Sequence, residues 1–236
     1  MDKRDERVLI IEDEPNLGAT LAERLKDAGY DVTWARTRQE SETLFKNSRF
    51  DLALIDVGLP DGSGFDLARS LRAQAPGTAF VFLTALSRPE DRIEGLELGA
   101  EDYIGKPFHL KELLLRVQNV IRRAQLLRAL PNPAQGLAIG EALVWFDRME
   151  IEAHGERVSM SQKEASLLRF LFERRGKVTS RSEILDEVWD PDEFPSERTI
   201  DNFIVKIRRW IEPDPTKPVH LRSVRGMGYQ LYESTL

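Results

Sequence analysis

The stretch Leu52–Gly64, LALIDVGLPDGSG, decides the fold, because an apolar run with the length of a buried strand ends in a single carboxylate, Asp56. The residues that follow are mostly glycine, proline, aspartate and serine, which favour a turn. A continuous apolar run is typical of a strand that is covered on both faces, as in a parallel sheet. In open sheets of this kind ligands bind beyond the carboxyl ends of the strands, where Asp56 would lie.

The first half of the chain alternates between short apolar segments and amphipathic ones. We expect strands at residues 7–13, 30–35, 50–56, 78–85 and 100–105. Helical spacing of apolar residues, as in Leu17, Leu21 and Leu25, predicts helices at residues 16–29, 38–46, 64–74, 88–99 and 110–130. This alternation predicts an α/β domain over residues 1–128, with a five-stranded, parallel, doubly wound (flavodoxin-like) sheet.

The pattern changes after the last of these helices. Residues 129–136, ALPNPAQG, contain two prolines and a glycine, and we expect them to form a linker. Short antiparallel strands are expected over residues 137–160, amphipathic helices at 161–176, 180–189 and 196–211, and a hairpin over 219–233 that turns at Gly226–Gly228. Residues 137–236 are therefore predicted to form a second, α+β domain, in which the last two helices make a helix-turn-helix-like pair.

The composition limits the classes of function. The 236 residues are 41% hydrophobic and 31% charged, which fits a globular chain of one large domain or two ordinary ones. No apolar run approaches the roughly 18 residues of a membrane helix. The N-terminus lacks the pattern of a secretory signal. The chain has no cysteine, which excludes disulfides and thiol chemistry, and we expect a cytoplasmic protein with no membrane partner.

Carboxylates gather at one edge of the predicted sheet. Glu12 and Asp13 follow the first strand, Asp56 ends the third, and these strand ends are expected to be adjacent. Crowded carboxylates repel one another, so at least one pKa would rise unless a cation were bound. Oxygen ligands suit Mg²⁺, which would also hold a phosphate against Asp56 while that carboxylate becomes an aspartyl phosphate. At the ends of the fourth and fifth strands, Thr84 can donate a hydroxyl and Lys106 a positive charge.

Each of these residues also has a simpler explanation. Glu12 and Asp13, which precede a proline, could cap a helix. Asp56 could belong to a turn, Thr84 could be an ordinary strand residue, and Lys106 could lie on the surface. The joint arrival of all five at one sheet edge, each at the end of a strand, favours the site.

The segments IIEDE, LIDVGLPDGSG, FLTA and DYIGKPF resemble the signature segments of the receiver domains of two-component response regulators. The resemblance covers about the first 125 residues. It implies that Asp56 is the phosphoacceptor and that Mg²⁺ is held by Glu12, Asp13, Asp56 and the backbone carbonyl of Gly58.

The same resemblance implies further roles at the other strand ends. Thr84 and Tyr103 would form a switch pair, and Lys106 would contact the phosphoryl group. The Lys106–Pro107 peptide bond would be cis. An alternative interpretation is that Asp56 is the aspartyl nucleophile of a phosphatase of the haloacid-dehalogenase type. The motif of those phosphatases has a second aspartate two residues after the nucleophile. This chain has Gly58 at that position, so we do not expect an enzyme.

The resemblance also implies a two-fold dimer, formed by the fourth helix, the fifth strand and the fifth helix of the receiver domain. Salt bridges between subunits would join Arg92 to Glu112, Asp102 to Arg116, and Glu101 to Arg123. A two-fold interface needs self-complementary charge, which these positions could give. The simpler explanation is a solvated surface, on which residues 112 and 116 form a pair within one helix.

The second domain carries a basic region inside an acidic chain. The net charge is −6, but residues 198–225 hold seven basic and three acidic side chains, a local excess of +4. In the segment SERTIDNFIVKIRRWI, apolar residues recur every three to four positions from Ile200 to Ile211, so that Asn202, Lys206 and other polar residues face elsewhere. Such a helix can enter a major groove, although a lone helix of this kind is more simply a solvent-facing one.

Residues 137–236 resemble the winged-helix output domain of the OmpR/PhoB-type response regulators. SQKEASLLRFL is similar to their first helix, RTIDNFIVKIRRWIE to their recognition helix and LRSVRGMGYQL to their wing. The resemblance implies DNA contacts from Arg198, Thr199, Asn202, Lys206, Arg208 and, in the wing, Arg225.

The two resemblances together predict a response regulator. A sensor histidine kinase would phosphorylate Asp56, the receiver domain would dimerise, and the second domain would bind promoter DNA, with RNA polymerase as a further candidate partner. The alternative is a DNA-binding regulator that does not depend on phosphorylation and uses its receiver domain only for dimerisation. The complete set of site residues argues against that alternative.

Overall fold

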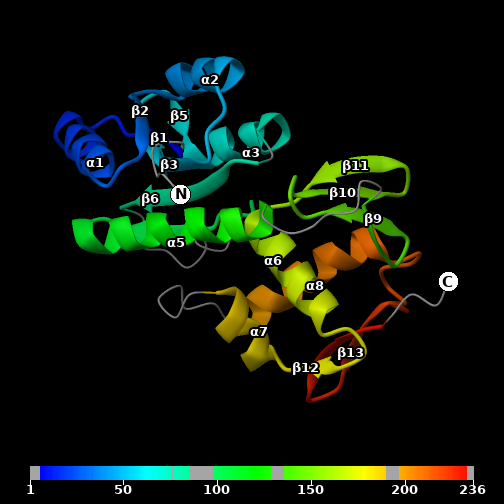
Figure 1. Ribbon diagram of the computed structural model, residues 1–236. Helices are drawn as coiled ribbons and strands as arrows, with labels where there is room; N and C mark the ends of the chain where they lie inside the picture. Colours follow the sequence, from blue (N-terminus) through cyan, green and yellow to red (C-terminus); the bar gives the residue numbers. More distant parts are fainter. Residues whose placement is uncertain (1–5, 76, 86–97, 129–135, 190–196, 233–236) are drawn as a thin grey trace. The chain divides into compact units, whose positions relative to one another are not determined.

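The computed structural model describes residues 6–75, 77–85, 98–128, 136–189 and 197–232 (Figure 1). The chain divides into two compact units, residues 1–125 and 126–236, which are described separately below. Among the described residues, no helix has the length and apolar character needed to span a bilayer.

The first unit is built on a parallel sheet whose strand order is β2-β1-β3-β6-β7. Its strands are β1 (Arg7–Ile11), β2 (Asp31–Ala35), β3 (Leu52–Asp56), β6 (Ala79–Thr84) and β7 (Asp102–Gly105). The pairs β1–β2, β1–β3, β3–β6 and β6–β7 are all parallel, so every strand presents its carboxyl end at the same edge. The predicted five-stranded parallel sheet is therefore confirmed.

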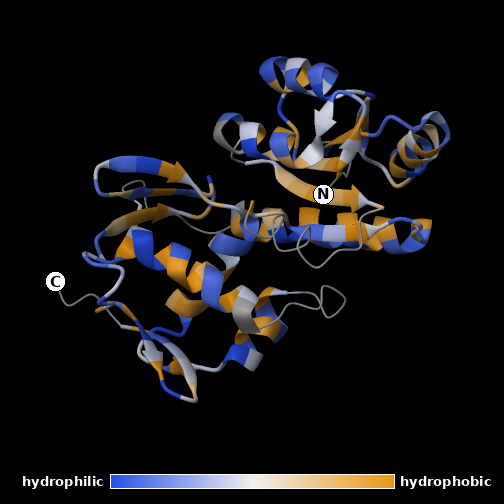
Figure 2. Cartoon of the chain, turned by 180° about the vertical axis from the view of Figure 1, so that it is seen from behind, coloured by the Kyte–Doolittle hydropathy of each residue, from blue (hydrophilic) through white to orange (hydrophobic). Residues whose placement is uncertain are grey.

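Helices cover both faces of this sheet. The described helices are α1 (Pro15–Asp27), α2 (Arg38–Asn47), α3 (Gly64–Gln74) and α5 (Leu110–Arg128). The helix expected at residues 88–99 falls largely outside the described residues, which resume at residue 98. Val8 and Ile10 of β1 pack in one cluster with residues of α1 and α5, whereas Leu9 and Ile11 pack in another with residues of α2 and α3. In Figure 2 the helices alternate accordingly between hydrophilic and hydrophobic colours.

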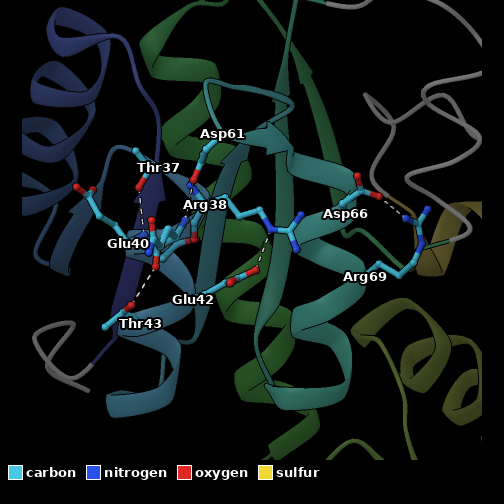
Figure 3. A network of polar contacts seen from close by, with 10 residues as sticks. Thr37, Arg38, Glu40, Glu42, Thr43, Asp61, Asp66 and Arg69 are labelled. Carbon is cyan, nitrogen blue, oxygen red and sulfur yellow. Dashed lines mark hydrogen bonds and ion pairs between the residues drawn. The ribbon is translucent and has the colours of Figure 1, made fainter.

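The turn after β3 contains a small hairpin that the sequence did not predict. Strands β4 (Gly58–Leu59) and β5 (Gly62–Ser63) pair antiparallel, and between them Asp61 accepts hydrogen bonds from the backbone N–H groups of Arg38 (2.8 Å) and Gln39 (3.0 Å). Figure 3 shows Asp61 directed at the start of α2. Burial opposes ionisation of Asp61, but these hydrogen bonds outweigh it and lower the pKa of the carboxyl group. The hairpin after Asp56 is thus fastened to the N-terminus of α2.

The second unit contains two antiparallel sheets and three described helices. Strands β8 (Leu137–Ile139), β9 (Ala142–Trp145), β10 (Glu150–Ala153) and β11 (Glu156–Ser159) form one sheet in the order β11-β10-β9-β8. Helices α6 (Gln162–Glu173), α7 (Arg181–Val188) and α8 (Glu197–Ile211) follow, and β13 (Leu221–Val224) and β14 (Gly228–Leu231) form the terminal hairpin. The predicted α+β unit is confirmed.

One strand of the second unit was missed. The two-residue strand β12 (Val178–Thr179) pairs with β14 and makes the hairpin a three-stranded sheet. Helices α6 and α7 begin with reciprocal capping boxes, in which Ser161 pairs with Glu164 and Ser180 with Glu183. The N-cap of α8 expected at residue 196 lies outside the described residues.

Candidate functional site

Three carboxylates meet at the carboxyl edge of the parallel sheet. Glu12 follows β1 and is fully buried, Asp56 is the last residue of β3 and is 8% exposed, and Asp13 is half-buried. One carboxylate oxygen from each residue lies within 4.8 Å of one from each of the others. The parallel strands produce this arrangement, because β1 and β3 are neighbours and end together.

Lys106 joins the cluster from the segment after β7. Its Nζ lies 2.7 Å from Glu12 Oε2 and 2.7 Å from Asp56 Oδ2, and its backbone N–H donates to the Thr84 carbonyl at 2.7 Å. The Lys106–Pro107 bond is cis, as the resemblance implied. Burial alone would lower the pKa of Lys106, but its hydrogen bonds to Asp56 and Glu12 raise the pKa above the usual value.

The charges of the cluster do not balance within it. Three carboxylates stand against one ammonium group, and desolvation by burial raises the pKa of Glu12, with the nearby Asp56 acting in the same direction. A divalent cation bound by the three carboxylates would neutralise the excess and favour their ionised forms. Hard oxygen donors at one edge, close enough to share an ion, fit Mg²⁺.

The remaining predicted receiver residues, Thr84 and Tyr103, lie on the strands β6 and β7, beyond β3 in the sheet. Thr84 ends β6 and is 3% exposed. Tyr103, on the neighbouring strand β7, is half-buried, with its ring centroid 5.1 Å from that of Phe82 and 6.2 Å from that of Phe65. The structure therefore places the threonine at the strand end and the tyrosine ring against an aromatic group in the core.

The backbone approaches Asp56 closely at two glycines, of which Gly64 alone requires the absence of a side chain. The backbone N–H of Gly58 donates to Asp56 Oδ1 at 3.1 Å. At Gly64, the first residue of α3, a Cβ atom would lie 2.2 Å from the backbone oxygen of Asp56, closer than any van der Waals contact allows. Gly64 thus lets the start of α3 lie directly against the backbone of Asp56.

The acidic and basic residues predicted to bridge two subunits are paired within the chain. Arg116 donates to Asp102 at 2.8 Å and to Glu112 at 2.9 Å, and Arg123 lies 3.9 Å from Glu101. Burial would lower the pKa of Arg116, but the charge of Asp102 and the hydrogen bonds raise it. Arg92, the sixth residue of the predicted interface, lies outside the described residues.

Helix α8 of the second unit has one buried and one exposed side. The predicted buried stripe is confirmed, since Ile200, Ile204 and Ile207 are at most 1% exposed. Asn202 and Arg209 are exposed, Thr199 is half-buried, and Val205 is 48% exposed. The side chain of Arg198 lies outside the described residues. The open side of α8 therefore carries amide, apolar and basic groups together.

Two basic residues predicted to contact DNA are engaged inside the unit. Arg208 donates from Nε to the backbone carbonyl of Leu221 and from Nη2 to Ser223 Oγ, both at 2.9 Å, so its guanidinium lies against the terminal hairpin. Burial lowers the pKa of Arg208. Lys206 forms an ion pair with Glu164, the capping-box residue of α6. Arg225, near the turn of the hairpin, is exposed.

A polar cluster that joins three elements was missed by sequence reasoning. Arg181 of α7 donates to Asp201 of α8 at 3.1 Å and to the hydroxyl of Tyr229 of β14 at 3.0 Å, and that hydroxyl donates to Asp201. The guanidinium of Arg181 also lies 4.8 Å from the centroid of the Tyr229 ring. The cluster holds α7, α8 and the hairpin together. Its one sign in the sequence is the presence of an acidic residue, Asp201, within the basic segment.

Comparison with known families agrees with this division of the chain. Residues 8–118 match the response regulator receiver domain family, and residues 155–231 match the family described as transcriptional regulatory protein, C terminal. Neither is a family of catalytic enzymes.

Known proteins match the chain over almost its whole length. It is 36% identical over 229 residues to the sensory transduction protein RegX3 of Mycolicibacterium smegmatis, covering 95% of this chain and 98% of RegX3. It is 35% identical to protein PetR of Rhodobacter capsulatus, with 95% of both chains covered.

Solved structures of full-length proteins also match. The response regulator DrrB, described as a Thermotoga maritima OmpR/PhoB homologue, is 30% identical with a TM-score of 0.50, covering 97% of this chain and 99% of DrrB. A variant of RitR has a TM-score of 0.80 at 22% identity, covering 97% of this chain and 100% of the other, and is similar in fold.

Proposed function

We propose, because this chain belongs to the family of two-component response regulators that join a receiver domain to an OmpR/PhoB-type DNA-binding domain, that phosphorylation of Asp56 controls its binding to promoter DNA. The observation that carries the proposal is the convergence of Glu12, Asp13, Asp56 and Lys106 at one sheet edge. We assign residues 1–128 to the receiver domain, 129–136 to the linker and 137–236 to the winged-helix domain.

In the receiver domain, an oxygen of Asp56 attacks the phosphorus of a phosphohistidine on a sensor histidine kinase, the P–N bond breaks, and the imidazole leaves with the electron pair. Glu12, Asp13, Asp56 and the backbone carbonyl of Gly58 would hold Mg²⁺, which would supply positive charge opposite the incoming phosphoryl oxygens. Lys106, already within 2.7 Å of Asp56, then shifts from this carboxylate to the new phosphoryl group.

The signal leaves the site through the neighbouring strands. Phosphorylation replaces the single negative charge of Asp56 with about −1.5 to −2 charges on the phosphoryl group, and the hydroxyl of Thr84 moves toward its strong hydrogen-bond acceptors. Tyr103 turns into the space that this movement opens, and the face formed by the fourth helix, β7 and α5 becomes competent to dimerise. Two winged-helix domains then bind adjacent half-sites in promoter DNA. This binding takes place in the cytoplasm, with RNA polymerase as a candidate partner.

Phosphate-affinity gel electrophoresis after incubation with a small acyl phosphate and Mg²⁺ tests the first step. We expect a shifted band for the wild type and none for Asp56→Asn, since the amide cannot form an acyl phosphate. The shift should also disappear when EDTA is added before the phosphodonor. An unshifted wild-type band would favour the alternative, a regulator whose DNA binding does not depend on phosphorylation.

DNA binding is tested separately by fluorescence anisotropy with operators selected from random DNA. We expect affinity to fall steeply with salt, because basic side chains displace counterions from phosphates. Asn202→Ala should reduce the preference for the selected sequence, whereas Lys206→Ala should weaken all sequences alike. Equal losses on every sequence for both variants would contradict this division between base reading and phosphate contact.

A further inference from the structure

The backbone of the dipeptide Glu12–Asp13 lies just beyond the end of the parallel ladder. Strand β1 ends at Ile11, and the last backbone hydrogen bond to β2 runs from the N–H of Glu12 to the carbonyl of Ala35, at 3.1 Å. The carbonyl groups of Glu12 and Asp13 must therefore find partners outside the ladder. Both partners are side chains: Trp34 lies near the end of β2, and Arg36 is the first residue after that strand.

Trp34 supplies the first of these partners. Its indole Nε1–H donates to the backbone carbonyl of Glu12 at 2.9 Å. The ring is held in place by α1, where a Cβ atom at Gly18 would lie 2.2 Å from Trp34 Cζ2. Only glycine lets the indole lie this close to the helix, so Gly18 and Trp34 form a matched pair.

Arg36 supplies the second partner. Its Nη2 donates to the backbone carbonyl of Asp13 at 3.3 Å, while its own backbone N–H donates to Glu40 Oε2 at 2.7 Å. Arg36 is exposed, so the contact is weaker than that of Trp34. The two donors reach consecutive carbonyl groups from the same side of the dipeptide.

We propose that Trp34 and Arg36 are positioning residues for the divalent cation, because they fix the backbone that carries two of its three carboxylate ligands. The inference rests on the proposed function, since it concerns the ion needed for phosphotransfer. With both carbonyls tied toward β2, rotation of these peptide groups is restricted, and the side chains of Glu12 and Asp13 stay directed at Asp56. Loss of the indole N–H lets the peptide group of Glu12 rotate more freely. Ordering the carboxylate ligands around the cation then costs more free energy, and the cation binds more weakly.

The test is the affinity of the full-length chain for Mg²⁺ alone, measured by isothermal titration calorimetry without a phosphodonor. Trp34→Phe keeps a ring beside Gly18 but removes the N–H donor, and we expect about tenfold weaker Mg²⁺ binding, as for other residues that orient metal ligands. Arg36→Ala should weaken binding by a smaller factor, about twofold to threefold, because its contact is exposed and longer. Arg36→Lys, which retains a donor, should recover part of that loss.

Trp145→Phe is the matched control. The indole N–H of Trp145 is buried in the second unit and has no hydrogen-bond partner among the described residues, so Mg²⁺ affinity should not change. Gly18→Ala gives an independent perturbation, since alanine is normally the better helix former but here displaces the indole. We expect it to weaken Mg²⁺ binding although Trp34 is retained.

The outcomes separate this inference from the proposed function. If the wild type binds Mg²⁺ and both Trp34→Phe and Gly18→Ala bind it equally well, the positioning role is refuted and the function stands. If the wild type binds no Mg²⁺, the proposed phosphotransfer site fails and the inference fails with it. At saturating Mg²⁺, Trp34→Phe should reach the wild-type extent of phosphorylation, which distinguishes weaker ion binding from a damaged fold.

Discussion

Because of the hydroxyl of Tyr229, the free energy of unfolding of the second unit should fall as the pH rises through the alkaline range. The side chain is 3% exposed, and its hydroxyl lies between Asp201 and Arg181. Burial, followed by the hydrogen bond and charge of Asp201, raises the pKa of Tyr229 from 10.0 to about 12. The folded state therefore retains the phenolic proton at pH values where the unfolded chain releases it. The contribution is complete below pH 10 and is lost as the pH rises towards 12.

The size of the effect follows from the two pKa values. Linkage between 10 and about 12 lowers the free energy of unfolding by about 1.4 kcal/mol at pH 11, and by about 2.7 kcal/mol in the limit above both values. Tyr229→Phe removes this titration together with the hydrogen bonds of the hydroxyl group. At neutral pH the loss of those bonds should cost about 1.5 kcal/mol, because both involve an ionised partner, Asp201 or Arg181. The two effects are similar in size, so the advantage of the wild type should vanish near pH 11.

Urea unfolding of wild type and Tyr229→Phe, followed by tryptophan fluorescence from pH 8 to pH 11, measures this difference. Three of the four tryptophans, Trp145, Trp189 and Trp210, belong to the second unit. Burial also raises the pKa of Tyr30 in the first unit, but both proteins retain that residue, so its effect cancels. Parallel stability curves for the two proteins across this pH range would refute the assigned role of the hydroxyl.

Three other contacts are tested by further substitutions, two of them with a matched comparison variant. Gly64→Ala should destabilise the first unit by about 2 kcal/mol and slow phosphorylation, because the new Cβ would overlap a backbone oxygen. Gly77→Ala, where a Cβ meets nothing within 4 Å, is its control in the same urea titration. Glu212→Gln should cost about 3 kcal/mol, measured by calorimetric unfolding, because this fully buried carboxylate accepts hydrogen bonds from three consecutive backbone N–H groups. Arg116→Ala should cost about 2 kcal/mol through its buried ion pair, whereas Glu112→Ala, whose side chain is 45% exposed, should cost less than about 0.5 kcal/mol in parallel denaturation curves.

The parallel sheet could be predicted because its signal is local. The run Leu52–Asp56 is buried at every position, as its composition indicates, and the alternation of strands with helices indicates a parallel sheet. The convergence of Glu12, Asp56 and Lys106 then needs no side-chain detail, because strand ends alone bring them to one edge. The strand β12 could not be predicted, since two residues carry no periodicity and pair only with a distant hairpin.

The partners of the polar side chains were much less predictable. Arg208 and Lys206 have the charge and spacing of DNA contacts, yet one lies against the hairpin and the other pairs with Glu164 of α6. Trp34 is an ordinary strand residue in the sequence, and its bond to the Glu12 carbonyl depends on a glycine sixteen positions earlier in α1. Such contacts join residues whose proximity only the folded chain defines, so periodicity and composition contain no sign of them.

The ion pairs of α5 and β7 bear on how the proposed dimer would be stabilised. Arg116 already contacts Asp102 and Glu112, and Arg123 lies near Glu101, all within one chain. A dimer that joins the same groups across its two-fold axis exchanges one set of ion pairs for another, so the number of paired charges need not rise. Electrostatic attraction then gives little net free energy, although it still selects the register in which opposite charges meet. In the proposed dimer, these charges therefore specify how two receiver domains align, and the burial of apolar surface must supply most of the affinity.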